Sequence, residues 1–178
     1  MQLEMVCTDR TVDLVEEGFD LAVRAGRLAD SSLIARRLGS IERLVVAAPG
    51  YVKARGVPKA PRDLEKHDCL LFGAGREGNV WKLQAGSRSV DVPIRVRLVV
   101  NEPDMLRAVT LAGAGVALLP NILCTTDLAE GRLQRILPDW GASGAPVHAL
   151  YPSTRHHSPK VMAFVDFLRE HWPVHPPG

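Results

Sequence analysis

Residues 102–120 read EPDMLRAVTLAGAGVALLP and predict a helix that Gly113 and Gly115 end, followed at once by a buried strand. Either Asn101 or Glu102 caps the helix, because Pro103 suits the first helical position, where no backbone N–H is needed. The apolar side chains at helical spacing form its expected inner face: Met105, Leu106, Val109 and Ala112. The run Val116–Pro120 holds no polar side chain, which is typical of a strand buried on both faces. This stretch therefore favours an α/β protein.

Strands and helices also alternate towards the amino terminus. Leu3–Val6 and Phe19–Val23 are expected strands, separated by a short helix that ends at Gly18. This strand–helix–strand order is a βαβ unit and implies parallel pairing. Leu33–Ala48 is either two strands or one long strand with a bend near Gly39.

The remaining elements follow the same mixture. We expect short helical segments at 51–55, 61–64 and 122–129, and strands at 69–72, 116–120, 133–137 and 147–151. Residues 80–83 and 92–100 are expected to form a hairpin about the turn Gly86–Arg88. In its last strand, Arg95 and Arg97 alternate with apolar residues and predict one solvated face. The last helix has Ser158 as its cap, Pro159 at its first position and an apolar stripe from Val161 to Trp172.

Composition indicates a soluble globular protein of one or two domains. The chain has 178 residues, 46% of them hydrophobic and 24% charged, which excludes a disordered chain. Three widely spaced cysteines form no disulfide framework or metal knuckle, and together with the lack of a signal peptide they favour the cytoplasm. The most apolar stretch, Leu111–Pro120, has about half the length of a membrane crossing. A net charge of +2 gives no reason to expect DNA binding by these residues themselves.

The candidate motifs for catalysis, cofactor binding or metal binding lack the sequence context that each chemistry requires. Gly73–Gly78 has the spacing of a dinucleotide fingerprint, but a strand-like segment follows where the phosphates need a helix. His156 and His157 are adjacent and chelate poorly, and the cysteines lie in apolar surroundings. We therefore expect no enzyme, no cofactor and no metal. The free N–H groups of the helix that begins near Glu102 either hold an anionic ligand group or are an ordinary solvent-capped end.

Several segments together resemble a known family. LEMVCTDR at 3–10, DLVEEGFDLAVR at 13–24 and DSSLIARRL at 30–38 closely resemble the effector-binding domain of LysR-type transcriptional regulators. The later segments 100–102, 112–120, 131–140, 147–152 and 159–168 fit the same family in the right order.

This resemblance implies a type 2 periplasmic-binding-protein-like fold of two Rossmann-like lobes joined by two crossover segments. Residues 1–42 with 146–178 would form the first regulatory lobe, lacking its first strand and helix, and 43–145 the second. A small, anionic metabolite would bind in the interlobe cleft and modulate transcription through an N-terminal winged helix–turn–helix that these residues do not include. Homodimers or tetramers are implied. A stand-alone small-molecule-binding protein of the same fold is the alternative.

The effector-binding residues implied by the resemblance lie at strand ends and at a helix start, where open α/β sheets place ligands. In the first lobe they are Thr8, Ala25, Gly26 and Arg27. In the second lobe they are Gly73, Ala74, Asn101, Glu102 and Met105.

Overall fold

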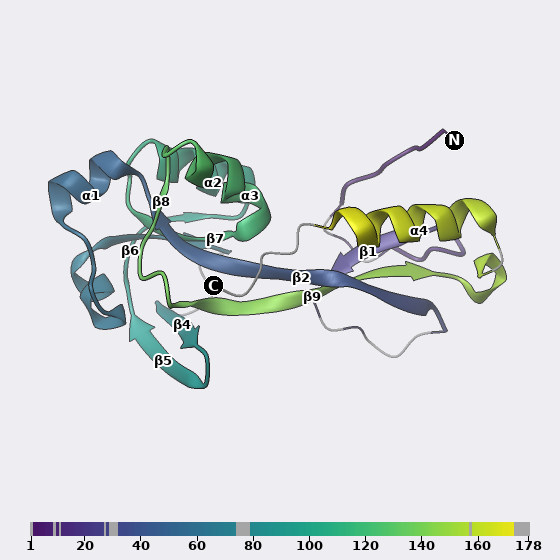
Figure 1. Ribbon diagram of the computed structural model, residues 1–178, viewed down its shortest axis with the longest axis horizontal. Helices are drawn as coiled ribbons and strands as arrows, with labels where there is room; N and C mark the ends of the chain where they lie inside the picture. Colours follow the sequence, from purple (N-terminus) through teal and green to yellow (C-terminus); the bar gives the residue numbers. More distant parts are fainter. Residues whose placement is uncertain are drawn as a thin grey trace. The chain divides into compact units, whose positions relative to one another are not determined.

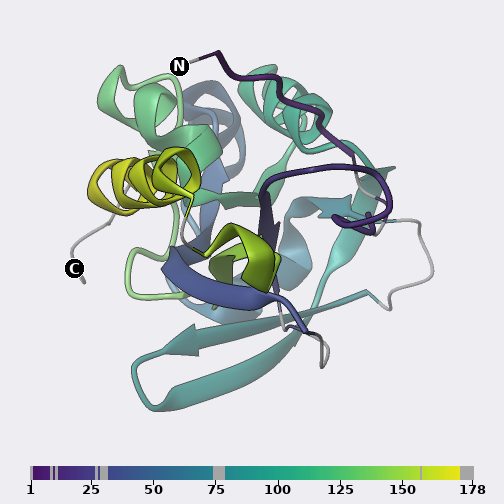
Figure 2. The same ribbon diagram turned by 90° about the vertical axis from the view of Figure 1, so that its right-hand side faces the viewer.

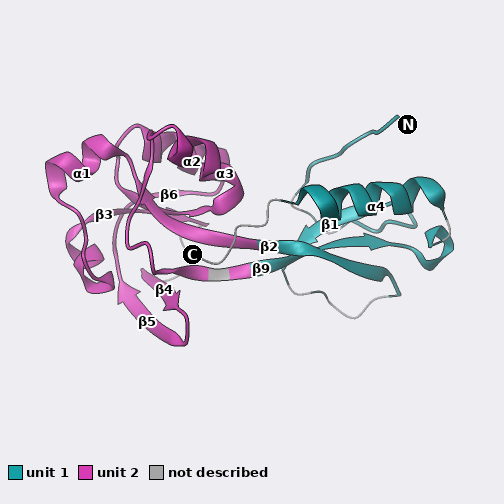
Figure 3. Ribbon diagram, viewed as in Figure 1, with its two compact units in different colours: residues 1–40, 145–177 teal, residues 41–144, 178 magenta. Residues whose placement is uncertain are grey.

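The computed structural model describes residues 2–8, 10, 12–26, 28, 32–73, 79–156 and 158–172, apart from the side chain of Ser143 (Figure 1). The chain divides into two compact units (Figure 3). Unit 1 comprises residues 1–40 with 145–177, and unit 2 is built on residues 41–144. Two long strands, β2 (Ile34–Ala47) and β9 (Gly141–Tyr151), have residues in both units.

The central strands of unit 2 form a mixed sheet. β3 (Asp68–Phe72) pairs in parallel with β6 (Arg95–Val100) and with β7 (Val116–Pro120). On its other edge β7 pairs antiparallel with β2, with Leu119 opposite Leu44. The parallel pairing needs a crossover connection between strands, and α2 (Pro103–Leu111) supplies it between β6 and β7.

Both faces of this sheet are covered, because successive side chains along a strand point to opposite faces. Leu70, Ala117 and Leu119 enter one core with Leu106 of α2 and Cys124 of α3 (Asn121–Ala129). Cys69, Leu71, Val116 and Leu118 enter the other core, with residues of α1 (Pro49–Arg55), the 3-10 helix η1 (Pro61–Lys66), β4 (Val80–Ala85) and β5 (Arg88–Pro93). The prediction that Val116–Pro120 is a strand buried on both faces is confirmed.

Glycine is required at the entry to β7. The backbone of Gly115 lies so close to β3 that an added Cβ would stand 2.3 Å from the carbonyl oxygen of Asp68. Gly113 ends α2 with φ of +78°, and its N–H donates to the carbonyl of Thr110 at 3.0 Å. The two glycines that were expected to stop the helix therefore have different roles, one in the turn and one in close packing.

The expected hairpin of unit 2 needs one correction. β4 pairs with β5 across the two-residue turn Gly86–Ser87, and the hairpin is the teal two-stranded ribbon of Figure 2. The segment 92–100 is not one strand: β5 ends at Pro93, Ile94 is buried, and β6 leaves the hairpin to pair with β3. The predicted strand at 133–137 shrinks to β8 (Gln134–Arg135). The N–H of Leu133 donates to the carbonyl of Asp127 at 3.1 Å, and Leu137 has φ of +53°, which is outside the extended region.

Unit 1 contains β1 (Ala22–Ala25), the first part of β2, the end of β9, the 3-10 helix η2 (Ser153–Arg155) and α4 (Pro159–His171). β2 is a single strand of 14 residues, which decides between the two alternatives for this segment. Gly39 lies against the ring of Trp172, where an added Cβ would stand 2.3 Å from Cδ1. α4 starts at Pro159 as predicted, but Ser158 makes no side-chain cap and only the backbone hydrogen bond from Met162 joins it to the helix.

The predicted βαβ unit at the amino-terminal end is wrong. Residues 2–8 form no strand, because an extended segment becomes one only where another backbone pairs with it, and no described strand does so. The short helix is a single turn that ends at Gly18, which has φ of +75°. The Asp13 side chain holds this turn by accepting hydrogen bonds from the N–H groups of Val15 and Glu16. β1 pairs antiparallel with β9, not in parallel.

Among the described residues, no helix is both long and apolar enough to cross a membrane.

The Gly115→Ala variant is expected to lose about 2 kcal/mol of unfolding free energy, since the new methyl group meets fixed backbone atoms of β3. The matched control is Gly50→Ala in α1, where an added Cβ has no heavy atom within 4 Å and should raise stability by about 0.5 kcal/mol. Urea unfolding followed by circular dichroism measures both. Equal stability of the two variants would contradict the close approach of β7 to β3.

Candidate functional site

Four of the predicted site residues gather at the carboxyl-terminal edge of the β3–β6 pair. Phe72 and Val100 are partners in the parallel register, so Gly73 and Asn101 follow them side by side. The N–H of Gly73 donates to the carbonyl oxygen of Val100 at 2.9 Å. Gly73 has φ of +143°, a conformation that side chains rarely allow, so a ligand can approach the backbone here without meeting a Cβ.

Glu102 occupies the start of α2 with its own carboxylate. Oε1 accepts from the N–H of Asp104 at 3.1 Å, and Oε2 accepts from the N–H of Met105 at 2.6 Å. Pro103 has no N–H, and the N–H of Leu106 donates to the Glu102 carbonyl. Of the two predicted caps, Glu102 is therefore the one used. The expectation of free donors at this helix end is wrong, because a carboxylate of the chain already binds them.

Asn101 and Met105 complete this group. Asn101 is exposed directly after β6, and its amide can both donate and accept hydrogen bonds. Met105 is 53% exposed, so it does not belong to the inner face of α2 as the periodicity predicted; Leu106 and Thr110 are the buried residues of this helix. An amide, a carboxylate, a thioether and a backbone without a Cβ thus lie at one edge of unit 2. We call these four residues, Gly73, Asn101, Glu102 and Met105, the strand-end group.

A buried ion pair holds α2 in position. Asp127 of α3 is fully buried, and it accepts from Arg107 of α2 (Nε–Oδ2, 2.5 Å) and from Arg132 (Nη2–Oδ1, 2.6 Å). The hydrogen bond from Arg107, with a further one from Arg132, holds the pKa of the Asp127 carboxyl below its usual range. The carboxylate therefore stays ionised at neutral pH and ties the helix that carries Glu102 and Met105 to its neighbour.

The predicted site residues of unit 1 have different environments. Thr8 and Ala25 line a cavity of about 580 Å³ that is bounded by residues 3–8, β1 and α4. Gly26 does not line it; its N–H donates to the carbonyl of Pro146 at 2.9 Å, with φ of +112°. Arg27 and Ala74 lie outside the described residues. Phe164 and Leu168 also line this cavity, although they were not among the predicted site residues; their place in the apolar stripe of α4 is the signal that could have indicated it.

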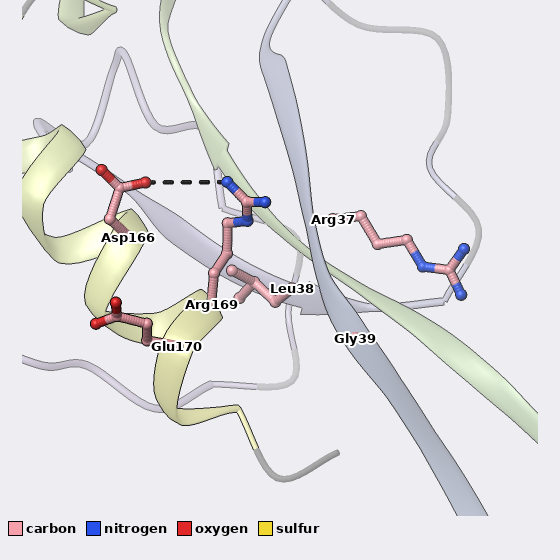
Figure 4. A pocket seen from close by; sticks show the side chains of 6 residues that line it. All are labelled: Arg37, Leu38, Gly39, Asp166, Arg169 and Glu170. Atoms are coloured by element: carbon pink, nitrogen blue, oxygen red, sulfur yellow. Dashed lines mark ion pairs between the residues drawn. The ribbon is translucent and has the colours of Figure 1, made fainter. Parts of the chain in front are cut away.

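A second hollow of unit 1, of about 670 Å³, lies beside β2 and α4 and contains none of the predicted residues (Figure 4). Its charges are partly paired, because Arg169 lies 4.0 Å from Asp166. Figure 4 shows Arg37 extending from β2 away from α4.

The cysteines offer no reactive thiolate in the cores. Burial raises the pKa of Cys69 to about 12 and that of Cys124 to about 11, so both stay protonated at neutral pH. Among the described residues, no cluster of three or more histidine, cysteine or acidic side chains could hold a metal ion. The strand-end group itself offers an amide, a carboxylate, a thioether and an open backbone, which are able to make hydrogen bonds and van der Waals contacts.

Known proteins are similar to this chain over most of its length. The model of the family described as "LysR substrate binding domain" matches residues 1–173. An HTH-type transcriptional repressor of Pseudomonas aeruginosa is 35% identical over 172 residues, covering 96% of this chain and 54% of the relative. The HTH-type transcriptional activator AaeR of Escherichia coli is 34% identical over 162 residues, covering 90% of this chain and 52% of the relative. The chain spans about half the length of these curated relatives.

Among solved structures, the regulatory domain of CrgA, a LysR-type transcriptional regulator from Neisseria meningitidis, is similar with a TM-score of 0.77 and 30% identity. The match covers 92% of this chain and 80% of that domain. A similarity of this extent concerns the fold as well as the sequence.

Proposed function

The chain belongs to the LysR substrate-binding domain family, with the periplasmic-binding-protein-like fold of LysR-type regulatory domains, and from this premise we propose that it senses a small metabolite for a transcriptional regulator. Curated relatives are named HTH-type transcriptional regulators, and by this similarity the whole protein would bind DNA through an N-terminal helix–turn–helix and act as a homodimer or tetramer. In the proposed whole protein, which acts in the cytoplasm, the helix–turn–helix would bind the promoter and this chain would bind the metabolite. Units 1 and 2 would be the two regulatory lobes.

The observation that carries this proposal is the strand-end group itself. Gly73, Asn101, Glu102 and Met105 come from two parallel strands and the following helix, and they meet at the edge where open α/β sheets bind ligands. No group there is a nucleophile activated by a base, so binding and release of an unchanged ligand is the chemistry that these residues support. The alternative of a stand-alone binding protein rests on the same residues and differs only in what the binding controls.

Each side chain suggests a part in recognition. The Asn101 amide would fix the orientation of the ligand with a donor and an acceptor, and Gly73 would let the ligand reach the backbone. Met105 would cover an apolar part of the ligand, because its flexible thioether adapts to irregular shapes. An anionic effector, which we also propose, would have to bind away from the N–H groups that Glu102 occupies, or displace its carboxylate.

The Asn101→Ala variant is expected to bind the effector about tenfold more weakly, because one to two hydrogen bonds to the ligand are lost. A thermal-shift screen of small metabolites identifies the effector, and calorimetric titration of the wild type and the variant gives the affinities. Asn79→Ala, which removes another exposed asparagine at the start of the hairpin, is the matched control and should bind as the wild type does. Unchanged affinity in Asn101→Ala would contradict the proposed site.

The charge of the effector is tested by Glu102→Gln, which removes the negative charge and keeps one acceptor for the start of α2. An anionic effector should bind about threefold to fivefold more tightly to this variant, since a nearby like charge has been removed. Glu65→Gln removes an equal charge from an exposed position of η1 and controls for the net charge of the chain. A weaker affinity in Glu102→Gln alone would show that the effector is a cation or a hydrogen-bond donor.

A further inference from the structure

We propose that unit 2 contains a second ligand site, for a small carboxylate with a compact apolar body, at the edge of the sheet opposite to the strand-end group. The site is a hollow of about 690 Å³ lined by α1, the carboxyl-terminal end of α2 and the first residues of β3 and β6. Asp68 begins β3 here, whereas Gly73 follows the last residue of the same strand at the other edge. This site goes beyond the proposed effector site and does not depend on it.

The charges at this hollow are unbalanced. The Asp68 carboxylate pairs with Arg95, with Arg97 (Nη1–Oδ2, 3.4 Å) and with Arg55 (Nη2–Oδ2, 4.0 Å). Three guanidinium groups around one carboxylate leave two positive charges uncompensated within this cluster. Arg132 also lines the hollow, but its charge is taken up by Asp127 and Glu130.

The positive groups are more exposed than the negative group, although Asp68 also lines the hollow. The side chain of Asp68 is 15% exposed, while those of Arg55, Arg95 and Arg97 are 44% to 60% exposed. The Arg95 guanidinium lowers the pKa of the Asp68 carboxyl, so the carboxylate stays charged and the balance is kept at neutral pH. A ligand carboxylate can therefore reach Arg55 and Arg97, which line the hollow, and form charge-assisted hydrogen bonds.

The rest of the lining selects against a bare inorganic ion. Ala48, Pro49, Ala54 and Leu111 contribute short apolar surface beside the two arginines. A sulfate or phosphate would leave this surface in contact with water, whereas an aliphatic carboxylate would bury it. The hollow has a volume in the range of small-molecule sites.

A hydrogen-bond network fixes the floor of the site. The Tyr51 hydroxyl accepts from the N–H of Asp68 at 2.9 Å and lies 3.2 Å from Nδ1 of His67, to which it donates when that nitrogen carries no proton. His67 is buried, and desolvation together with the nearby Arg55 lowers its pKa, so the imidazole is neutral and can accept that hydrogen bond. The backbone that carries Asp68 is thereby held in place before any ligand binds.

The experiment titrates the chain with the straight-chain carboxylates from acetate to hexanoate, and with sulfate, at constant ionic strength. Affinity is expected to rise with chain length and to fall at least about fivefold in Arg97→Gln and in Arg55→Gln. Both arginines are largely exposed, and circular dichroism checks that the variants are folded. Lys82→Gln, which removes one exposed positive charge from β4, should bind hexanoate as the wild type does.

Three results with the ligands and variants named above would overturn the proposal. They are equal hexanoate affinity in the wild type and both arginine variants, sulfate binding as tight as hexanoate binding, or an equal loss in Lys82→Gln. The Asn101→Ala variant separates the two sites, since it should leave hexanoate binding unchanged even where effector binding fails. Loss of hexanoate binding in Asn101→Ala would assign the carboxylate to the strand-end group and would also contradict the second site.

Discussion

The two-sided burial of β7 is the constraint on which unit 2 depends. Its side chains enter two separate cores in alternation, so one strand fixes α2 and α3 over one face and α1, η1 and the β4–β5 hairpin over the other. Gly115 allows β7 to lie against the backbone of β3 at its entry. This packing holds β3 and β6 in position, so both ends of this strand pair are fixed. The two proposed ligand sites lie at those opposite ends.

The two ends of the β3–β6 pair differ in charge, and each is therefore expected to bind a different kind of ligand group. At the carboxyl ends, the Glu102 carboxylate satisfies the helix donors and leaves a negative group beside the Asn101 amide. At the amino ends, a single sunken carboxylate faces three arginines. The Asp127 ion pair connects α2 to α3 between these regions and keeps the helix that separates β6 from β7 in one position.

Local residue patterns predicted many elements of unit 2, but they did not predict which strands pair with one another. Pro103, Gly113 and the apolar run 116–120 predicted helix start, helix end and buried strand, and each is confirmed. The pairing of 95–100 with β3, the antiparallel β1 and the unpaired 2–8 depend on contacts distant in sequence, which no local pattern reports. For the site, the resemblance named Gly73 and Asn101 as effector-binding residues, and that role stays a prediction. Only the fold shows that they follow paired strand residues, and that Glu102 binds its own helix. Arg95 and Arg97 were read as a solvated face, and they are exposed; their shared partner Asp68 lies across a register known only from the fold.

Amide hydrogen exchange, measured with and without the metabolite that the thermal-shift screen identifies, tests the central claim most directly. We expect slower exchange at Gly73 and over 101–106 when the metabolite binds, while the β7 amides stay among the slowest in both states. Slower exchange confined to other segments, with 73 and 101–106 unchanged, would contradict the assignment of the strand-end group as the effector site.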